Sequence, residues 1–197
     1  MYCARRIILV EGIAEQIVIS ILFEQKTGQS LEEIGCTVIN VSGVAFRHFL
    51  TIFQYGFFKK CVVLTDSDAG TKTENRAESL RDDFKDIQHV EIQVTTESTF
   101  EKDLISSNRS GDGKELFLDA LSMTKPNNGP KFRTETGASD IDVEAFFAEI
   151  KNYKAEFAFS IMSVLEDERQ KAEKDNRPAK KLAIPNYILL AFDFIKG

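Results

Sequence analysis

The sequence has few of the residues that build disulfide frameworks, zinc sites or membrane spans. Its three cysteines are Cys3, Cys36 and Cys61, an odd number at wide spacing, which gives neither a disulfide framework nor a zinc knuckle. The longest apolar stretch, residues 17–23, is much shorter than the roughly 20 residues that a membrane helix needs. We therefore expect a cytoplasmic protein with reduced thiols and no membrane span.

Sequence signatures of nucleotide binding and of serine-type catalysis are also missing. No Gly-x-Ser-x-Gly elbow occurs, and neither 70–73 nor 111–115 completes a P-loop, so we expect no ATP site in this chain. The two histidines, His48 and His89, are far apart and have no triad pattern around them. These absences exclude a P-loop ATPase and a nucleophile-elbow hydrolase.

Positive charge is too scarce for a protein that binds nucleic acid by electrostatics alone. The 197 residues include 25 Lys and Arg against 31 Asp and Glu, for a formal net charge of −6. This sign disfavours a simple DNA-binding module. It does not exclude an enzyme that acts on nucleic acid through bound cations, because two divalent ions would change −6 to −2 and place their charge at the reacting phosphate.

Hydrophobic residues make up 43% of the chain, and in the first half their pattern predicts an α/β fold. Strands are predicted at 6–10, 36–41, 61–65 and 90–94, and the helices between them at 14–25, 45–53 and 75–84. Unbroken apolar strands separated by helices indicate a mostly parallel sheet that is covered on both faces. The first half is therefore predicted to be a doubly wound α/β domain.

The second half of the chain is predicted to be helical. Helices are expected at 113–121, 143–150, 153–170 and 186–194, with a long loop from 125 to 142 that is rich in Asn, Gly, Pro, Ser and Thr. The mixed charges from 166 to 181 are typical of a solvated helix face. We place the α/β core at residues 1–97, and the remaining elements with a helical subdomain at 98–197.

Acidic residues follow two of the predicted strands directly. Glu11 follows the first strand and Asp66 the third, with Asp68 two residues further on. Open α/β folds place their ligand crevice at the carboxyl ends of the strands, so these carboxylates can converge there. Glu15, one helical turn beyond Glu11, would lie on the same side. Such crowded carboxylates need protons or cations, and oxygen ligands select Mg²⁺ or Mn²⁺ over zinc.

Glu101 and Asp103 come just beyond the fourth strand, where another carboxylate can reach the same crevice. Their alternative interpretation is a pair of acids in the first turn of a helix, a position that the helix dipole favours. An Asp-x-Asp or a Glu-Gly after a strand also occurs in ordinary turns. The joint placement on two strand ends is what points to metal-assisted phosphoryl transfer.

Several segments together carry a family resemblance. They read I-I-L-V-E-G-I-A-E-Q at 7–16, V-I-N-V-S-G-V-A-F-R-H-F at 38–49, V-V-L-T-D-S-D-A at 62–69, S-T-F-E-K-D-L at 98–104, Y-K-A-E-F-A at 153–158 and I-P-N-Y-I at 184–188. The chain resembles, over nearly its whole length, the Toprim region of the overcoming-lysogenization-defect (OLD) family of nucleases. The Glu and the Asp-x-Asp are general Toprim features, whereas V-x-N-V-x-G-V-A-F is selective for the OLD branch. Phe100 and Ala155 replace the family's Leu and Gly.

The resemblance implies a Rossmann-like Toprim fold, mostly parallel and flanked by helices, with a C-terminal helical extension. It implies an endonuclease that cleaves DNA by two-metal phosphodiester hydrolysis with Mg²⁺ or Mn²⁺. The implied metal-binding residues are Glu11, Glu15, Asp66, Asp68, Glu101 and Asp103. The implied catalytic residues are Glu11, Asp66, Asp68 and Lys154. Lys154 matches a family lysine that neutralises charge at the scissile phosphate, and Glu11 can also act as a general base.

By the same resemblance this chain is an isolated nuclease region, because family members carry an N-terminal ABC-type ATPase and dimerisation region. The implied partners are DNA, that ATPase domain and, in some relatives, a helicase-like protein. A homo-oligomeric full-length protein and a role in anti-phage defence are implied as well. Two other interpretations stay open: another Toprim enzyme of topoisomerase or primase type, and a non-catalytic α/β interaction module whose acids are structural.

Overall fold

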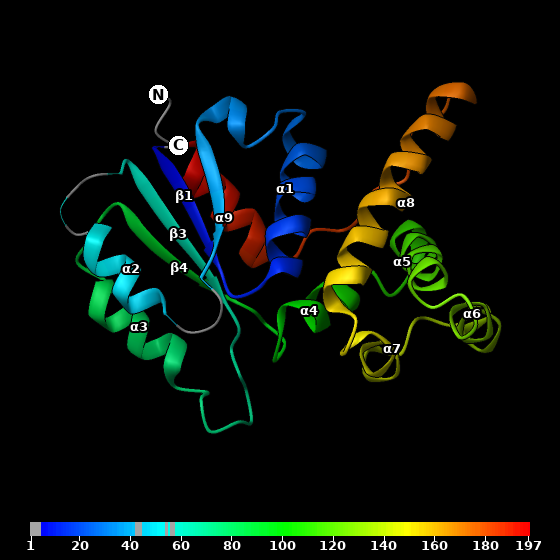
Figure 1. The fold of residues 1–197 in the computed structure, drawn as a ribbon, viewed down its shortest axis with the longest axis horizontal. Helices are drawn as coiled ribbons and strands as arrows, with labels where there is room; N and C mark the ends of the chain where they lie inside the picture. Colours follow the sequence, from blue (N-terminus) through cyan, green and yellow to red (C-terminus); the bar gives the residue numbers. More distant parts are fainter. Residues whose placement is uncertain (1–4, 42–44, 54, 56–57) are drawn as a thin grey trace. The chain divides into compact units, whose positions relative to one another are not determined.

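The computed structural model describes residues 5–41, 45–53, 55 and 58–197 (Figure 1). Cys3 lies outside this part of the chain, as do residues 42–44 of the V-x-N-V-x-G-V-A-F block. The chain divides into two compact units, Met1–Asp103 with Pro185–Gly197, and Leu104–Ile184. The last helix therefore belongs to the first unit.

A parallel sheet forms the centre of the first unit. Its strands are β1 (Arg6–Val10), β2 (Cys36–Asn40), β3 (Lys60–Thr65) and β4 (Val90–Val94), in the order β2-β1-β3-β4. After β1 the chain first adds β2 on one side of β1, and then adds β3 and β4 on the other side of β1. The predicted mostly parallel α/β sheet is confirmed, and every strand lies within one residue of its expected range.

Helices cover both faces of this sheet, as Figure 1 shows. They are α1 (Ile13–Thr27), α2 (Phe46–Phe53), α3 (Arg76–Phe84) and α9 (Asn186–Lys196), with a short 3-10 helix, η1 (Glu32–Ile34). Strand side chains alternate between the faces. One face forms a core with α2 and α3 that contains Ile7, Leu9, Val41, Phe46, Leu50, Cys61, Val63, Leu80, Phe84 and Ile92. Phe46 and Leu50, one turn apart in α2, are therefore core residues.

On the opposite face α1 packs on β1 and β2, and α9 packs on β3 and β4. The rings of Phe23 in α1 and Phe192 in α9 meet edge to face at 5.1 Å between centroids. Lys60, the first residue of β3, donates a hydrogen bond to the carbonyl oxygen of Phe194 near the end of α9, at 2.6 Å. Helix α9 therefore runs antiparallel to β3 and begins at the carboxyl end of the sheet.

The second unit is helical, as predicted. Its helices are α5 (Gly111–Thr124), α6 (Gly129–Thr136), α7 (Val143–Ile150) and α8 (Lys154–Lys174), and α4 (Phe100–Ser107) spans the boundary between the units. The aromatic rings of Phe117, Phe132, Phe146 and Phe157 form the core, with neighbouring centroids 5.5–5.7 Å apart. Within the described residues, no helix is both long enough and apolar enough to cross a bilayer.

The predicted loop from 125 to 142 is wrong in its middle, where α6 forms. Pro130 lies at the start of that helix, where its missing N–H group costs nothing. Phe132 then reaches the ring of Phe146 at 5.5 Å, so that packing in the second unit stabilises a segment whose composition favours a loop. Helix α4 begins at Phe100, so Glu101 and Asp103 lie in the first turn of a helix, and their role in the site stays a prediction.

The charged run from 166 to 181 also differs from the prediction of a solvated helix face. Helix α8 ends at Lys174, and Glu168 inside the run is buried. Its carboxylate accepts hydrogen bonds from Arg177 at 2.5 and 3.1 Å and from the backbone N–H of Lys180 at 2.8 Å. These donors, Arg177 first, lower the pKa of Glu168 to about 2. Glu168 thus fixes the irregular chain that follows the helix.

Candidate functional site

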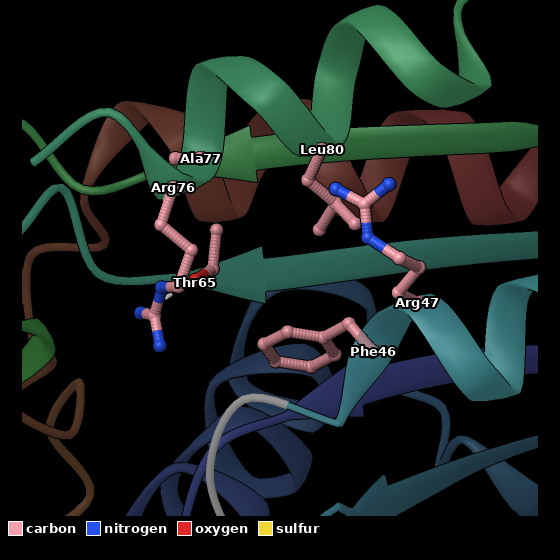
Figure 2. Close-up of a pocket in the computed structure, with 6 residues that line it drawn as sticks. All are labelled: Phe46, Arg47, Thr65, Arg76, Ala77 and Leu80. Carbon is pink, nitrogen blue, oxygen red and sulfur yellow. Dashed lines mark hydrogen bonds between the residues drawn. The ribbon is translucent and has the colours of Figure 1, made fainter. Parts of the chain in front are cut away.

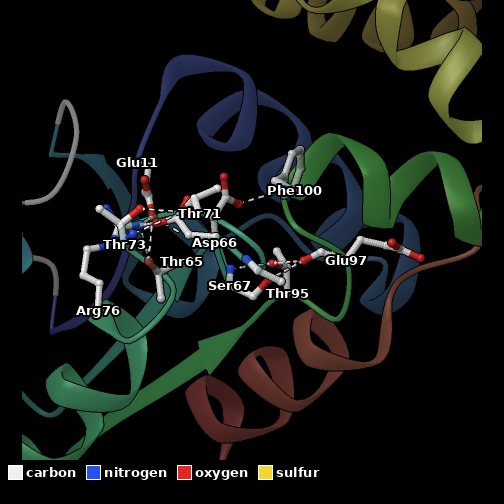
Figure 3. A network of polar contacts seen from close by, with 12 residues as sticks. Glu11, Thr65, Asp66, Ser67, Thr71, Thr73, Arg76, Thr95, Glu97 and Phe100 are labelled. Atoms are coloured by element: carbon white, nitrogen blue, oxygen red, sulfur yellow. Dashed lines mark hydrogen bonds and ion pairs between the residues drawn. The ribbon is translucent and has the colours of Figure 1, made fainter.

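Parallel pairing of β1 with β3 brings the first two predicted acids together. Leu9 pairs with Val63 in the register, so Glu11 comes level with the end of β3. The Glu11 Oε1 atom accepts a hydrogen bond from Thr65 Oγ1 at 2.6 Å and one from the backbone N–H of Asp66 at 3.1 Å (Figure 3). The strand order reverses between β1 and β3, and this switch point is where open α/β sheets bind ligands.

Asp66 is held between β3 and the start of α4. Its Oδ1 atom accepts a hydrogen bond from the backbone N–H of Phe100 at 2.7 Å. Burial, and after it the charges of Glu11, Glu101 and Glu15, raise the pKa of Asp66 to about 7 against the effect of that hydrogen bond. A carboxyl group with this pKa is partly protonated at neutral pH, and such perturbed groups cluster at functional sites.

Asp68 occupies a strained position in the loop after β3. Its φ angle is 52°, in the left-handed region that few residues other than glycine adopt. Its backbone N–H donates to the carbonyl of Ser98 at 3.2 Å, and its carbonyl accepts from the N–H of Thr71 at 2.9 Å. Nearby, Ser67 and Thr95 tie the loop to the chain after β4, as Figure 3 shows. The loop is therefore fixed by hydrogen bonds to its neighbours.

Arg76 is the cation of this site, and sequence reasoning missed it. Its Nη2 atom lies 2.7 Å from Glu11 Oε1, 3.1 Å from Asp68 Oδ2 and 3.3 Å from Thr65 Oγ1. Arg76 is the first residue of α3, and in the sequence it is one of 25 basic residues with no motif to mark it. Only the position of α3 over the end of β3 brings it to the acids.

Glu15 lies in the first turn of α1, and the backbone before it leaves room for its carboxylate. A Cβ atom on Gly12 would stand 2.8 Å from Glu15 Oε2, closer than such contacts occur. The Glu15 carboxylate therefore lies against the backbone of Gly12, and as the end of a flexible side chain it could shift to accommodate a larger residue there. The effect of Glu15 on the pKa of Asp66 places it electrostatically with the same group of acids.

Glu101 and Asp103 are both buried in the first turn of α4. Asp103 Oδ2 accepts a hydrogen bond from the backbone N–H of Thr96 at 2.6 Å, so this carboxylate closes the loop that precedes its own helix. Burial raises the pKa of Asp103, against the hydrogen bonds that its carboxylate accepts. Glu101 raises the pKa of Asp66 and so belongs electrostatically with the strand-end acids, whereas the contact of Asp103 is a structural one.

Tyr187, in the I-P-N-Y-I segment, is a second residue that the sequence did not assign to the site. It lies in the first turn of α9, which begins at the carboxyl end of the sheet. Its side chain is 5% exposed, and its hydroxyl has no hydrogen-bond partner among the described residues. Burial raises the pKa of Tyr187 well above its usual range, and the charges of Asp103, Asp66, Glu15 and Glu101 add to this effect. Tyr187 is therefore coupled electrostatically to the acidic group.

Lys154 belongs to the helical unit, where it is the first residue of α8. Its Nζ atom lies 5.8 Å from the centre of the Phe147 ring. His48 is exposed on α2. Within the described ranges, no three Asp, Glu, His or Cys side chains close around a common point as metal ligands. Instead, the Arg76 guanidinium lies between the carboxylates of Glu11 and Asp68.

A parallel sheet with a Glu after β1 and an Asp-x-Asp after β3 defines the Toprim class of α/β domains. Residues 3–68 match the family model of the overcoming lysogenization defect protein-like TOPRIM domain. The OLD-type Toprim segment that the motifs predicted is thereby confirmed.

Solved structures extend this likeness in fold to nearly the whole chain. The C-terminal region of the Xanthomonas campestris pv. campestris OLD protein, phased with platinum, has a TM-score of 0.65 and 19% identity, over 98% of this chain and 92% of that chain. The C-terminal region of the Burkholderia pseudomallei OLD protein has a TM-score of 0.64 and 21% identity, over 98% and 97%. No curated protein matches the sequence.

Proposed function

We propose that this chain is the DNA-cleaving region of an OLD-type protein and that its reaction centre lies at the carboxyl ends of β1 and β3. The observation that carries the proposal is the convergence of Glu11 and Asp66 at the switch point of the sheet, where Asp66 has a pKa raised to about 7. The family match of residues 3–68 supports the same conclusion.

The donor set suits hard divalent cations such as Mg²⁺ or Mn²⁺, because it consists of carboxylates without histidine or cysteine. We assign two such ions to Glu11, Asp66 and Asp68, with Glu15 and Glu101 beside them and Asp103 at the edge of the group. Bound cations of this kind lower the pKa of an attacking water and stabilise the leaving 3′ oxygen. Glu11 is the proposed base that receives the proton of that water.

The surrounding residues keep the acids in place for this chemistry. Thr65 and the backbone N–H of Asp66 fix the Glu11 carboxylate through Oε1, and the N–H of Phe100 fixes Asp66 through Oδ1. Hydrogen bonds of this kind orient carboxylate ligands and tune their basicity. The buried hydroxyl of Tyr187, which is coupled electrostatically to these acids, is the further donor that we propose beside them.

The direct test is cleavage of supercoiled plasmid by this chain in Mg²⁺, in Mn²⁺ and in EDTA. Wild type is expected to nick or linearise DNA only with a divalent cation. Asp66→Ala is expected to lower the rate by roughly a hundredfold or more, since a group that acts at the reacting atoms is lost. Asp82→Ala, which removes an exposed acid from α3, serves as the matched control. Retained Mn²⁺-dependent nicking by the Asp66 variant would contradict the assignment.

Lys154 is proposed to neutralise charge at the scissile phosphate, on the strength of the Y-K-A-E-F-A segment. Lys154→Ala should then lower the cleavage rate by about tenfold or more while DNA affinity falls much less, because the charge is needed where it develops in the transition state. Exposed Lys151, three residues earlier, gives the control variant Lys151→Ala. Equal losses of rate and affinity would instead assign Lys154 to DNA binding.

In this proposal the region works within a larger assembly. The similar solved structures are C-terminal regions of OLD proteins, which supports an N-terminal partner domain, for which we propose the ABC-type ATPase. DNA is the proposed substrate, and homo-oligomerisation through the ATPase part, a helicase-like partner and a role in anti-phage defence complete the proposal. Because the chain itself carries a net charge of −6, we expect its own affinity for DNA to be weak.

A further inference from the structure

Arg76 makes contacts that differ from those of an ordinary structural ion pair. One nitrogen, Nη2, is shared among Glu11 Oε1, Asp68 Oδ2 and Thr65 Oγ1, at 2.7, 3.1 and 3.3 Å. That nitrogen carries two hydrogens for three acceptors, so these contacts do not use the two-nitrogen fork that makes arginine–carboxylate pairs strong. The guanidinium is therefore attached to the acids at a single point.

The rest of the guanidinium confirms that this arrangement is not fully satisfied. The Nε atom of Arg76 is buried and has no hydrogen-bond partner among the described residues. A buried donor without a partner loses its hydrogen bonds to water and gains none in return, which destabilises this position of the guanidinium. At the same time 22% of the side chain is exposed, which leaves the guanidinium a path to water.

The position of Arg76 is the one that a divalent cation would need. Glu11 and Asp68 follow different strands, and the guanidinium is the group that links their carboxylates. A divalent cation that takes the same oxygens carries twice the charge and repels a guanidinium a few ångströms away. The divalent cation and the guanidinium therefore cannot both bind these two carboxylates closely.

We propose that Arg76 is an exchangeable counter-cation of the acidic site, which holds Glu11 and Asp68 together and gives way when a divalent cation binds them. This inference rests on the proposed function. It gives Arg76 a regulatory role, because the affinity of the site for metal then depends on the release of the arginine as well as on the acids.

The test is calorimetric titration of Mn²⁺ into the whole chain and its variants. Arg76→Gln is expected to bind Mn²⁺ roughly tenfold more tightly than wild type, because the competing charge is gone from a partly exposed position. Arg76→Lys keeps the charge and is expected to stay within about threefold of wild type.

Arg47→Gln is the matched control. Arg47 borders the same cavity of about 50 Å³ as Arg76, together with Phe46, Thr65 and Leu80 (Figure 2). Its guanidinium pairs with Asp83 instead of the strand-end acids. Its loss removes one positive charge from the same region and is expected to leave Mn²⁺ affinity unchanged.

The outcomes separate this inference from the proposed function. If wild type and Arg76→Gln both take up no Mn²⁺, the proposed metal-dependent function fails and the inference fails with it. If wild type binds Mn²⁺ and Arg76→Gln binds it equally or more weakly, only the inference is overturned, and Arg76 is a fixed positioning residue.

A measurement on the wild-type protein covers the case in which Arg76→Gln does not fold. The Nε–Hε cross-peak of Arg76, assigned by its absence from the spectrum of Arg76→Lys, is followed during a Mg²⁺ titration. Release predicts a shift of that peak that saturates with the site. An unchanged cross-peak at saturating Mg²⁺ would overturn the inference.

Discussion

Among the acids of the site, Asp66 has the largest consequence for the stability of the protein. Its pKa is 3.8 in a free chain and about 7 in the folded state, where burial and neighbouring acids disfavour the charge. Between these values the unfolded chain has released its proton while the folded protein retains it. Raising the pH from about 4 to 7 therefore favours unfolding, and above 7 the loss is complete.

Asp66→Asn should remove this pH dependence. Asparagine keeps an oxygen for the N–H of Phe100 but carries no charge. In EDTA at pH 8 the variant is expected to be more stable than wild type by on the order of 2 kcal/mol, and at pH 4 the two should be nearly equal. Urea unfolding at both pH values measures the difference, with exposed Asp82→Asn as control. A variant that is less stable than wild type at pH 8 would show that the ionised carboxylate stabilises the fold.

For single residues, the sequence predicted the positions of those site residues that directly follow a strand. Glu11 and Asp66 are brought together because two adjacent parallel strands end at the same edge, and apolar runs reveal where strands end. Thr65, Arg76 and Tyr187 escaped prediction because their roles depend on how a helix start or a neighbouring side chain lies in three dimensions. No spacing in the sequence marks such contacts.

Among the elements, the junction of α4 with α5 depends on one buried amide. Asn108 is fully buried, and its Nδ2 donates to the carbonyls of Leu104 and Ala183, both at 2.9 Å. Its Oδ1 accepts from the N–H of Ala183 at 2.8 Å. The side chain thereby joins the end of α4 to the chain that leads toward α9.

Gly113 in α5 has no room for a side chain, because Asn108 fills the space beside it. A Cβ atom on Gly113 would lie 2.2 Å from Asn108 Oδ1, so Gly113→Ala must displace an amide that makes three hydrogen bonds. We expect a loss of roughly 2–4 kcal/mol, measured as a lower midpoint of thermal unfolding. Asp112→Ala in the same turn is the control, and it should cost less than about 1 kcal/mol. An unchanged midpoint for Gly113→Ala would contradict the role of Asn108.

The helices and strands also show where the spacing of apolar residues predicts secondary structure well and where it does not. Strands and amphipathic helices were predicted to within a few residues because burial on one face determines their apolar spacing. Helix α6 was missed because its Gly, Pro and Thr residues favour a loop, and the packing of Phe132 on Phe146 outweighs that local preference. Glu168 was missed because a buried carboxylate paired with Arg177 cannot be distinguished by composition from its exposed neighbours.

At the scale of the whole molecule, the C-terminal residues Pro185–Gly197 return to the first unit. Helix α9 covers the face of β3 and β4 and brings Tyr187 to the carboxyl edge of the sheet. The motif that contains Tyr187 lies more than 80 residues beyond the last strand, so a division of the sequence into halves separates parts that fold together. Under the proposed function, a net charge of −6 means that contact with nucleic acid would need cations at this edge.

In the proposed function, the edge of the sheet formed by Glu11, Asp66 and Asp68 binds divalent cations. Crystals of this chain soaked in Mn²⁺, with diffraction recorded at the manganese absorption edge, test it most directly. We expect anomalous peaks about 2.2 Å from carboxylate oxygens of Glu11 and Asp66. Peaks confined to other surface carboxylates, or no peak at saturating Mn²⁺, would contradict it.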